Sequence, residues 1–416
     1  MTYADIAPTA GDERIGELDI IRGFALFGVL WVNMYGYPEY IVSGDRIVHL
    51  WGETLDHAVG LFTEWVAYGK AQALFSMLFG FGFAILSDRT EARGLDARIL
   101  YLRRILILLA VGVAHVLLLW AGDILHAYAL MGLVLMMTRK WPSRLVLGLG
   151  LALSLGTAVA GDLWLAAITP EGRQPAVFAL THAGMERRWD VFLGHDYAAY
   201  VRELWSMIGP EFYGSPLGYV FLGTILGRFL IGAWIYRQGW MQDTARYAAG
   251  FRRALPWLLI GGLAIAAVDP VMAALRVAIP QGAEHAPAFI KQLGQLVLAL
   301  GYGCGLVVLC QSAWWKRRLS GLGAVGQMAL TNYLMQSLVY MFVLNGFGLG
   351  WMRYAGATAC LGLAVVVFAL QILFSRWWLA RFRFGPAEWL WRWATYGHRP
   401  PLRRTEAAAS APANGL

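Results

Sequence analysis

Three ionisable residues, Lys70, His115 and Asp123, lie in or beside stretches that are otherwise apolar enough to cross a membrane. Ionisable groups at membrane depth are costly, so each needs a partner, a water-filled cavity or a function. Asp123 follows His115 across a short break, residues 120–122, and starts the next apolar run. A carboxylate that orients an imidazole makes a general base near neutral pH. We therefore predict a His115–Asp123 base; the alternatives are a structural histidine and an Asp123 that only caps a helix.

Lys70 follows Gly69 inside the apolar run Ala58–Leu86. As one helix this run would be about 43 Å long against a bilayer core of about 30 Å, which predicts a tilt, a break near Gly69 or an extension outside the membrane. The lysine would lie in the outer half. It either snorkels outward, faces a cavity and binds an anion, or pairs with Glu64 or Asp123.

Arg22 and Asn33 lie eleven residues apart in the first apolar run, and Arg104 and His115 repeat that spacing. Three helical turns place such a pair on nearly the same face, about 16 Å apart. An ion pair between Asp19 and Arg22 and a packed Asn33 are the structural explanation. A polar column that runs through the bundle is the functional one.

Two further motifs lie toward the C-terminus. Asn332 and Gln336 are four residues apart and share a helix face. Hydrogen bonding between helices is their usual role in membranes, and hydrogen bonding of a substrate or cofactor is the alternative. Glu388 and Arg392 are also four apart, in a Trp-rich segment, and there we expect an interfacial anchor.

The composition indicates the elements that must position these residues. The chain has 416 residues, of which 58% are hydrophobic and 14% charged, whereas soluble domains carry roughly 25% charged residues. We therefore predict an all-α integral membrane protein. The net charge of +8 comes with no nucleic-acid-binding pattern, and the three cysteines, all in apolar runs, predict no disulfide or metal framework.

We expect a bundle of about ten transmembrane helices, each built on roughly 20 mainly apolar residues. The candidate runs are Leu18–Gly36, Ala58–Leu86, Arg104–Ala121, Ile124–Thr138, Leu145–Ile168, Leu217–Tyr236, Ala254–Arg276, Phe289–Gln311, Val325–Gly346 and Ala355–Phe374. Most Lys and Arg residues fall in alternate connections, which predicts that both termini are cytoplasmic. Ten helices could close a bundle as a monomer, and an oligomer is equally compatible with the sequence.

The chain reads as a single polytopic membrane domain, residues 1–397. Its longest outer connection is the extracytoplasmic loop 169–215, which is rich in aromatic residues and could be a lid, an interfacial helix or an acceptor-binding surface. Residues 398–416 are rich in Pro and Ala, and we expect a disordered cytoplasmic tail.

Five blocks of the chain, residues 18–33, 69–82, 115–128, 326–337 and 384–396, together resemble the YeiB-type family of bacterial inner-membrane proteins, whose function is unknown. The resemblance runs through most of the chain and implies a multi-pass protein of the bacterial inner membrane. His57 and His126 are not part of the family pattern. The chain fits that pattern at Asn33, Lys70, Arg104, His115, Asp123, Tyr128, Asn332, Tyr333, Gln336, Glu388 and Arg392.

That family is more distantly similar to transmembrane acyltransferases such as heparan-α-glucosaminide N-acetyltransferase and the bacterial sugar O-acyltransferases. The similarity implies acetyl-CoA or another acyl-CoA as the cytoplasmic donor, and an extracytoplasmic acceptor that is a sugar, a glycan or lipid-linked. Those enzymes have an Asn near the end of the first span, as Asn33 is here, and a His soon afterwards. His57 could occupy that place, so it is the second choice for the base after His115.

In the mechanism this implies, Arg22 and Arg104 bind the donor phosphates at the inner mouth, and Asn332 and Gln336 follow along the donor path. No Gly-rich phosphate loop accompanies them.

At the far end of the path, His115 deprotonates the acceptor while Asn33, Asn332 or Lys70 stabilises the oxyanion. The alternative function is a transporter or flippase for a small anionic or lipid-like substrate, with Lys70, Asp123 and Glu64 as gating charges. A structural or regulatory membrane module is a third reading, which leaves the polar cluster unexplained.

Overall fold

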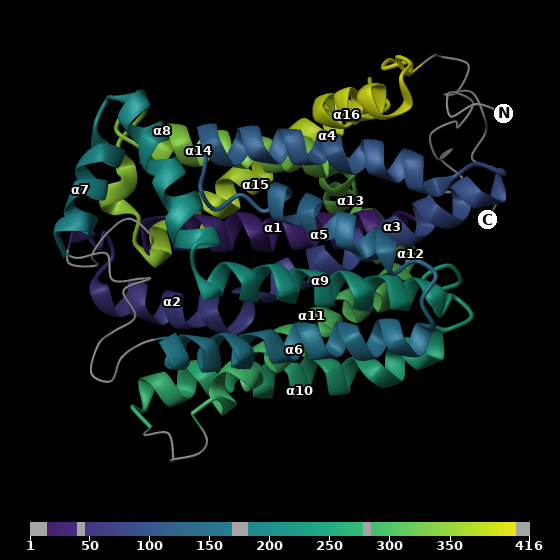
Figure 1. Ribbon diagram of the computed structural model, residues 1–416, viewed down its shortest axis with the longest axis horizontal. Helices are drawn as coiled ribbons and strands as arrows, with labels where there is room; N and C mark the ends of the chain where they lie inside the picture. Colours follow the sequence, from purple (N-terminus) through teal and green to yellow (C-terminus); the bar gives the residue numbers. More distant parts are fainter. Residues whose placement is uncertain (1–14, 40–45, 169–181, 278–283, 405–416) are drawn as a thin grey trace.

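The computed structural model describes residues 15–39, 46–168, 182–277 and 284–404 (Figure 1). These ranges are mainly helical, and the only β-type pairing within them is an isolated bridge between Phe382 and Arg403. In chain order the elements are α1 (Gly16–Glu39), α2 (Glu53–Val66), α3 (Lys70–Ala92), α4 (Ala97–Leu118), α5 (Leu125–Met137), α6 (Ser143–Ile168), α7 (His182–Leu193), α8 (Tyr197–Ser206), the π-helix η4 (Met207–Tyr213), α9 (Pro216–Arg237), α10 (Ala248–Ala274), α11 (Ala286–Cys310), α12 (Ala313–Arg318), α13 (Ser320–Gln327), α14 (Ala329–Leu344), the 3₁₀-helix η5 (Trp351–Tyr354), α15 (Ala357–Leu379) and α16 (Pro386–Tyr396).

The protein is an all-α, multi-pass membrane protein. Within the described ranges, eight helical stretches are long and apolar enough to cross a membrane, if the stretch Glu53–Ala92, which holds α2 and α3, is taken as one. The shorter apolar helices α5 and α14 coincide with the two remaining predicted spans. With 13 residues, α5 is about 20 Å long. If α5 ends at the membrane surface, a helix of that length begins inside the roughly 30 Å hydrocarbon core, and Asp123 then lies at membrane depth.

The predicted break near Gly69 is confirmed. Helix α2 ends at Val66, and Gly69 has a left-handed backbone with φ of 74° before α3 begins at Lys70. A side chain is disfavoured in this conformation. The long run is therefore two helices that meet at the glycine.

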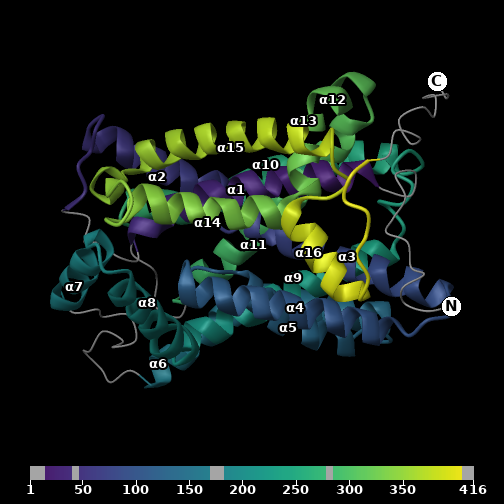
Figure 2. The same cartoon turned by 90° about the horizontal axis from the view of Figure 1, so that it is seen from above.

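The long helices lie side by side along the longest axis of the molecule, with α7 and α8 at one end and α12 and α16 at the other (Figure 1). Helix α6 packs along α9, α10 packs along α11, and α3 contacts α1, α9 and α11. Helix α16 runs obliquely between α14 and α4, both of which it contacts (Figure 2). It thus covers one end of the space between these two helices.

The two segments predicted to lie outside the bundle are partly described. Residues 182–215 of the outer loop form α7, α8 and η4, whereas 169–181 lie outside the described residues. Residues 398–404 of the predicted tail pack against the bundle, since the Leu402 carbonyl accepts from the Arg383 N–H at 2.9 Å and the Pro400 carbonyl from the Trp389 indole at 2.8 Å. The rest of that tail, 405–416, also lies outside the described residues.

Candidate functional site

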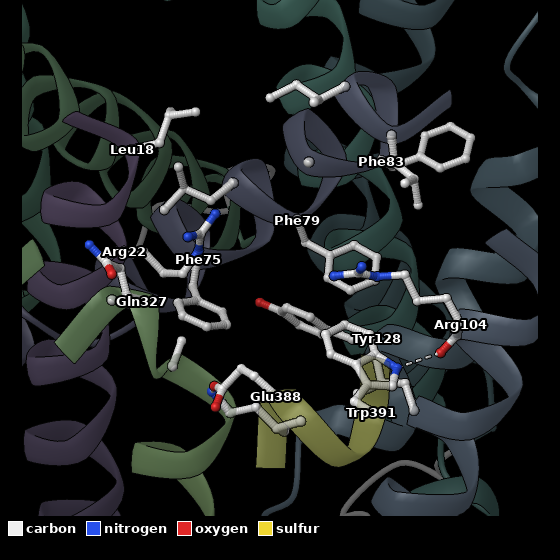
Figure 3. A pocket seen from close by; sticks show the side chains of 18 of the residues that line it. Leu18, Arg22, Phe75, Phe79, Phe83, Arg104, Tyr128, Gln327, Glu388 and Trp391 are labelled. Atoms are coloured by element: carbon white, nitrogen blue, oxygen red, sulfur yellow. Dashed lines mark hydrogen bonds between the residues drawn. The ribbon is translucent and has the colours of Figure 1, made fainter. Parts of the chain in front are cut away.

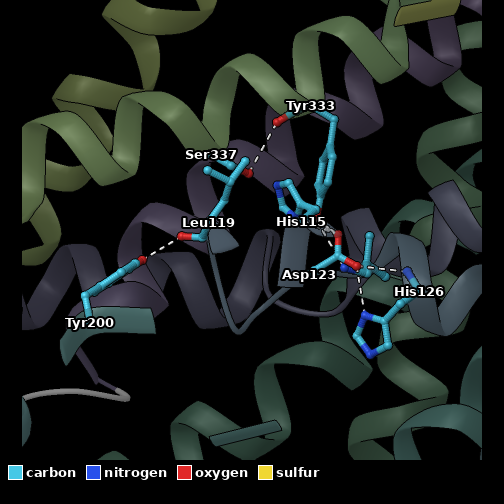
Figure 4. Close-up of polar contacts among 8 residues, drawn as sticks. His115, Leu119, Asp123, His126, Tyr200, Tyr333 and Ser337 are labelled. Carbon is cyan, nitrogen blue, oxygen red and sulfur yellow. Dashed lines mark hydrogen bonds and ion pairs between the residues drawn. The ribbon is translucent and has the colours of Figure 1, made fainter. Parts of the chain in front are cut away.

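The carboxylate of Asp123, between α4 and α5, is contacted on both of its oxygens (Figure 4). On Oδ1, His115 Nδ1 lies 2.8 Å away, although its N–H is not aligned for a hydrogen bond, and the Tyr333 hydroxyl donates at 3.3 Å. On Oδ2, His126 approaches with Nδ1 at 2.8 Å and donates its backbone N–H at 2.8 Å. The His115 and Asp123 side chains are only 1% and 0% exposed, so this is a buried two-histidine carboxylate cluster.

The local sequence explains how the two histidines meet one carboxylate. Gly112 lies one turn before His115, and a Cβ there would come within 2.3 Å of the backbone nitrogen of His126. The missing side chain lets α4 touch the first turn of α5. Because Asp123 accepts from the N–H three residues on, it also caps α5. The capping and the imidazole-orienting explanations of Asp123 therefore hold together.

The Nε2 atoms of His115 and His126 are buried and have no hydrogen-bond partner in the described part of the chain. Buried polar atoms are normally paired, so each Nε2 is available to a ligand group or a proton. The carboxylate beside each Nδ1 assigns the ring proton to Nδ1 and leaves Nε2 as the acceptor.

The two imidazoles have different surroundings. The ring of His115 lies 5.5 Å from that of Tyr333 on α14, whereas the ring of His126 lies 6.2 Å from Phe212 and 6.0 Å from Tyr213 of η4. Burial raises the pKa of Tyr213 to about 12, and the charge of Asp123 adds to this effect. Tyr213 is therefore a neutral phenol beside His126.

Helix α8, in the segment predicted to be the outer loop, contacts the end of α4 that bears His115. The hydroxyls of Tyr197 and Tyr200 donate to the carbonyls of Leu118 and Leu119, each at 2.6 Å (Figure 4 shows the second contact). Burial raises the pKa of Tyr200 well above its usual value, which keeps this donor protonated. The carbonyls left free where α4 ends are thereby satisfied by the loop.

A cavity of about 350 Å³ lies between α1, α3, α4, α14 and α16 (Figure 3). Arg22 and Arg104 enter it from α1 and α4, and Arg89 and Arg392 also line it. Asp19 and Glu388 are its only acidic lining residues within the described chain, so the cavity is positively charged overall.

The deep end of this cavity reaches the Asp123 cluster through one side chain. Ile124, Tyr128 and Tyr333 line the cavity there. The hydroxyl of Tyr333 accepts from the Ile124 N–H at 3.1 Å and donates to Asp123. A ligand that fills the cavity would thus touch the tyrosine that contacts the buried carboxylate.

Neighbouring side chains fix the positions of Arg22 and Arg104 in the cavity. Arg22 pairs with Asp19 at 2.7 Å, which is the structural alternative that the sequence left open. The guanidinium of Arg104 stacks 3.9 Å from the ring centre of Trp391, whose indole donates to the Arg104 carbonyl at 2.9 Å. Stacking leaves the edge of the Arg104 guanidinium able to bind an anion.

Glu388 has a role that the sequence did not indicate. It caps α14 from α16, with Oε1 accepting from the N–H groups of Leu330 and Thr331 at 2.7 and 3.1 Å, and Oε2 from the Thr331 hydroxyl at 2.6 Å. Burial raises the pKa of Glu388 above its usual value, against the effect of these hydrogen bonds. The cap fixes the start of the helix that carries Tyr333.

Other predicted site residues lie apart from the cluster. Lys70 donates to the Glu64 backbone carbonyl at 2.5 Å, at the start of α3. Asn33 hydrogen bonds to Tyr340. Within the described residues, neither makes a hydrogen bond to His115 or Asp123.

Asn332, Gln336 and His57 also point elsewhere. The Asn332 amide donates to Ser375 at 3.0 Å and the Gln336 amide to Gln371 at 3.0 Å, both on α15. The two residues join helices and do not line the cationic cavity. His57 is exposed on α2 and makes no contact with Asp123 among the described residues.

Sequence reasoning gave little weight to His126 and did not choose Tyr333 as a site residue. His126 had a usable signal, because the third residue after a helix-capping Asp places its backbone N–H, and here its ring, at the same carboxylate. For Tyr333 the position next to Asn332 carried no signal, because the contact of α14 with the α4–α5 connection had to be known first. Among the described residues, no group of three or more His, Cys, Asp or Glu side chains is placed to hold a metal ion.

Comparison with known proteins shows which protein family the chain is related to. Residues 235–398 match the family described as "Protein of unknown function (DUF418)". The chain is 31% identical to the uncharacterized protein YxaH of Bacillus subtilis (strain 168), across 96% of this chain and 99% of the relative. The chain belongs to this DUF418, YeiB-type family.

Two further relatives extend over nearly the same length. The uncharacterized protein YeiB of Escherichia coli (strain K12) is 28% identical across 92% of this chain and 96% of the relative. The uncharacterized 39.9 kDa protein in the amylase 3′ region of Bacillus acidopullulyticus is 27% identical across 95% and 97%. Membership of this family therefore applies to the full bundle, including α1, α4 and α5, which lie outside the matched range 235–398.

Proposed function

We propose that this protein is an acyltransferase of the bacterial inner membrane. It moves an acyl group, acetyl in the first instance, from cytoplasmic acyl-CoA to a hydroxyl or amine acceptor on the extracytoplasmic side. One observation carries the proposal: a cationic cavity ends at Tyr333, which contacts a carboxylate shared by two buried histidines.

The donor side rests on the charge and size of the cavity. Phosphate groups form short charge-assisted hydrogen bonds with guanidinium groups, and Arg22 and Arg104 face the cavity from opposing helices. Its volume of about 350 Å³ is in the range of small-ligand sites. It suits the acyl-bearing arm of the donor, with the phosphates at the arginines and the thioester toward Tyr333.

The chemistry rests on the two-histidine carboxylate cluster. As the acceptor oxygen or nitrogen attacks the thioester carbonyl, His115 Nε2 takes its proton, and Asp123 stabilises the imidazolium that forms. The carbon–sulfur bond then breaks, the acyl group stays on the acceptor, and the CoA thiolate takes up the proton. The Tyr333 hydroxyl lines the deep end of the cavity, and it is the candidate for oxyanion stabilisation once its one proton turns from Asp123 toward the thioester oxygen.

Acetyl-CoA binding to purified protein tests the donor side. We expect a saturable rise in the melting temperature with acetyl-CoA that is lost in Arg22→Ala and Arg104→Ala and kept in Arg98→Ala. Arg98 is an exposed arginine at the start of α4 that does not line the cavity. No shift with acetyl-CoA or longer acyl-CoAs in folded wild-type protein would remove the acyltransferase proposal.

A transporter of small anions is the second candidate, and a separate polar cluster favours it. Arg228 on α9 is buried and donates to Gln292 at 2.9 Å, to Gln295 at 2.6 Å and also to Gln72. It lies beside the helix break at Gly69, whose carbonyl it reaches at 3.5 Å. Broken helices and intramembrane cations mark substrate paths in transporters.

Reconstitution in liposomes separates the two candidates. The acyltransferase transfers label from external acyl-CoA to an acceptor and shows no anion flux. Flux that survives Asp123→Asn but is lost in Arg228→Gln would support the transporter instead.

A further inference from the structure

A second cavity, of about 580 Å³, lies between the helix pairs α6–α9 and α10–α11 and is closed by α1 and α3. Its lining is almost entirely apolar. The arginine-lined cavity adjoins it, because Leu18 and Leu78 line both. No part of the proposed acyl transfer uses this second space.

The two ends of the apolar cavity differ. At one end the lining includes Ile231 on α9 and Leu296 on α11. These residues follow Arg228 and Gln295, which are hydrogen-bonded at 2.6 Å and lie outside the lining. At the other end the lining consists of Trp240, Tyr247 and exposed Gly250. Trp and Tyr favour the membrane–water interface, so the cavity runs from the bundle interior to the surface at the α9–α10 connection.

This end of the cavity carries unbalanced positive charge. Arg246 and Arg253 are exposed, and neither side chain has a carboxylate partner within the described residues. The guanidinium of Arg246 lies 5.6 Å from the ring centre of Tyr247, which itself lines the cavity. With the orientation that the arginine distribution predicts, these residues face the anionic cytoplasmic leaflet.

We propose that this cavity binds one anionic phospholipid of that leaflet. One acyl chain fills the space between α9 and α11, and the phosphate lies on Arg246 and Arg253. An apolar cavity stays dry, and leaving it empty would forfeit the packing contacts of its walls. Hydrocarbon from the surrounding bilayer supplies those contacts, and the arginines select the headgroup charge. The proposal is independent of the acyltransferase proposal.

Two glycines allow the cavity to be filled without disturbing the backbone. A Cβ at Gly250 would meet nothing within 4 Å, and one at Gly303 would meet only Leu74 Cδ1 at 3.4 Å. Both line the cavity. Gly261 on α10 is the matched control, because its Cβ would also meet nothing within 4 Å and it lies outside the lining.

The test is native mass spectrometry of delipidated full-length protein titrated with phosphatidylglycerol or phosphatidylcholine. We expect one tightly bound phosphatidylglycerol, with phosphatidylcholine at least about tenfold weaker, since each arginine near a membrane surface is worth roughly fivefold in affinity for anionic lipid. Gly250→Leu and Gly303→Leu should each lose this site, and Gly261→Leu should keep it. If Gly303→Leu fails to fold, Gly250→Leu decides, because Gly250 lines the cavity and a Cβ there would meet no protein atom within 4 Å.

The headgroup is tested separately. Arg246→Gln combined with Arg253→Gln should bring phosphatidylglycerol down to the affinity of phosphatidylcholine, whereas Arg98→Gln should not. Wild-type binding in Gly250→Leu would place the lipid elsewhere and overturn the proposal. Equal affinity of the wild type for the two lipids would overturn it as well, since an anionic headgroup would not then be selected.

Discussion

Asp123 combines a structural and a chemical role in one side chain. One oxygen caps α5 and contacts His126, while the other lies against His115 and Tyr333. A buried carboxylate is tolerated because its donors surround it. Removal of its charge therefore affects helix geometry and imidazole orientation together, and the experiment has to separate these effects.

Asp123→Asn is expected to lower acyl transfer by roughly 10²–10⁴-fold, the usual contribution of general acid–base catalysis. His115→Gln should lose a similar factor, whereas His126→Gln should lose less if His115 is the base. Acetyl-CoA binding, read as a thermal shift, should survive in all three variants because none alters the arginines. Wild-type transfer in His115→Gln would exclude His115 as the base.

Glu388 gives a pH-dependent prediction. Its pKa in the folded protein is raised above the ordinary 4.5 by burial, so the folded state binds the proton more tightly than the unfolded chain. The stability that this group contributes is present below pH 4.5 and is lost as the pH rises through the raised pKa. The melting temperature of the wild type relative to Glu388→Gln should therefore be higher at pH 5 than at pH 8.

Glu388→Ala serves as the companion variant, because it also removes the cap of α14. Loss of the cap should cost about 0.5–2 kcal/mol of unfolding free energy, and the cost should be larger at pH 5 than at pH 8 because Glu388→Ala also lacks the titrating carboxyl. A pH-independent difference between the wild type and Glu388→Gln would show that the carboxyl has the same pKa in the folded and unfolded states.

At the scale of elements, the sequence predicted contacts within a helix or across a short turn. The break at Gly69, the Asp19–Arg22 pair and the meeting of His115 with Asp123 all belong to this class. The direction of a helix face did not follow from the sequence. Asn332 and Gln336 share a face as predicted, but that face meets α15 and not the cavity. The spacing of residues along a helix defines which side chains share a helix face. Only the packing of the neighbouring helices decides what that face contacts.

Gly112 tests whether the contact between α4 and α5 positions the cluster. Gly112→Val places a side chain where a Cβ would lie 2.3 Å from the backbone of α5, so the helices must separate. We expect a loss of about 1–3 kcal/mol in stability, as for other overpacked sites, together with a loss of transfer activity. Gly148→Val on α6, where a Cβ would meet nothing within 4 Å, is the control. Unchanged activity in Gly112→Val would show that the contact does not set the position of His115.

At the scale of the whole molecule, the site requires a particular topology. Residues of α16 line the arginine-lined cavity on one side of the Asp123 cluster, while Tyr213 of η4 lies against His126 on the other. A group that enters from one compartment and an acceptor that enters from the other could meet at the histidines only if α5 and α14 both cross the membrane. Helices α5 and α14 are both shorter than the eight stretches that are long enough to cross a membrane. The predicted count of ten spans therefore depends on these two helices.

Thiol labelling decides this point, because Cys304, Cys310 and Cys360 are all buried and leave little background. Lys140→Cys follows α5 and Arg353→Cys follows α14, and both positions are exposed.

With ten spans and both termini inside, a membrane-impermeant maleimide should label Arg353→Cys in intact spheroplasts but Lys140→Cys only after permeabilisation. His195→Cys, in the outer loop, and Lys316→Cys, on α12, are the outside and inside references. Labelling of Lys140→Cys from outside would mean that α5 turns back within the membrane. Protection of Arg353→Cys would mean the same for α14. Either result would put the two faces of the Asp123 cluster in contact with one compartment, and transfer across the membrane would no longer be possible at this site.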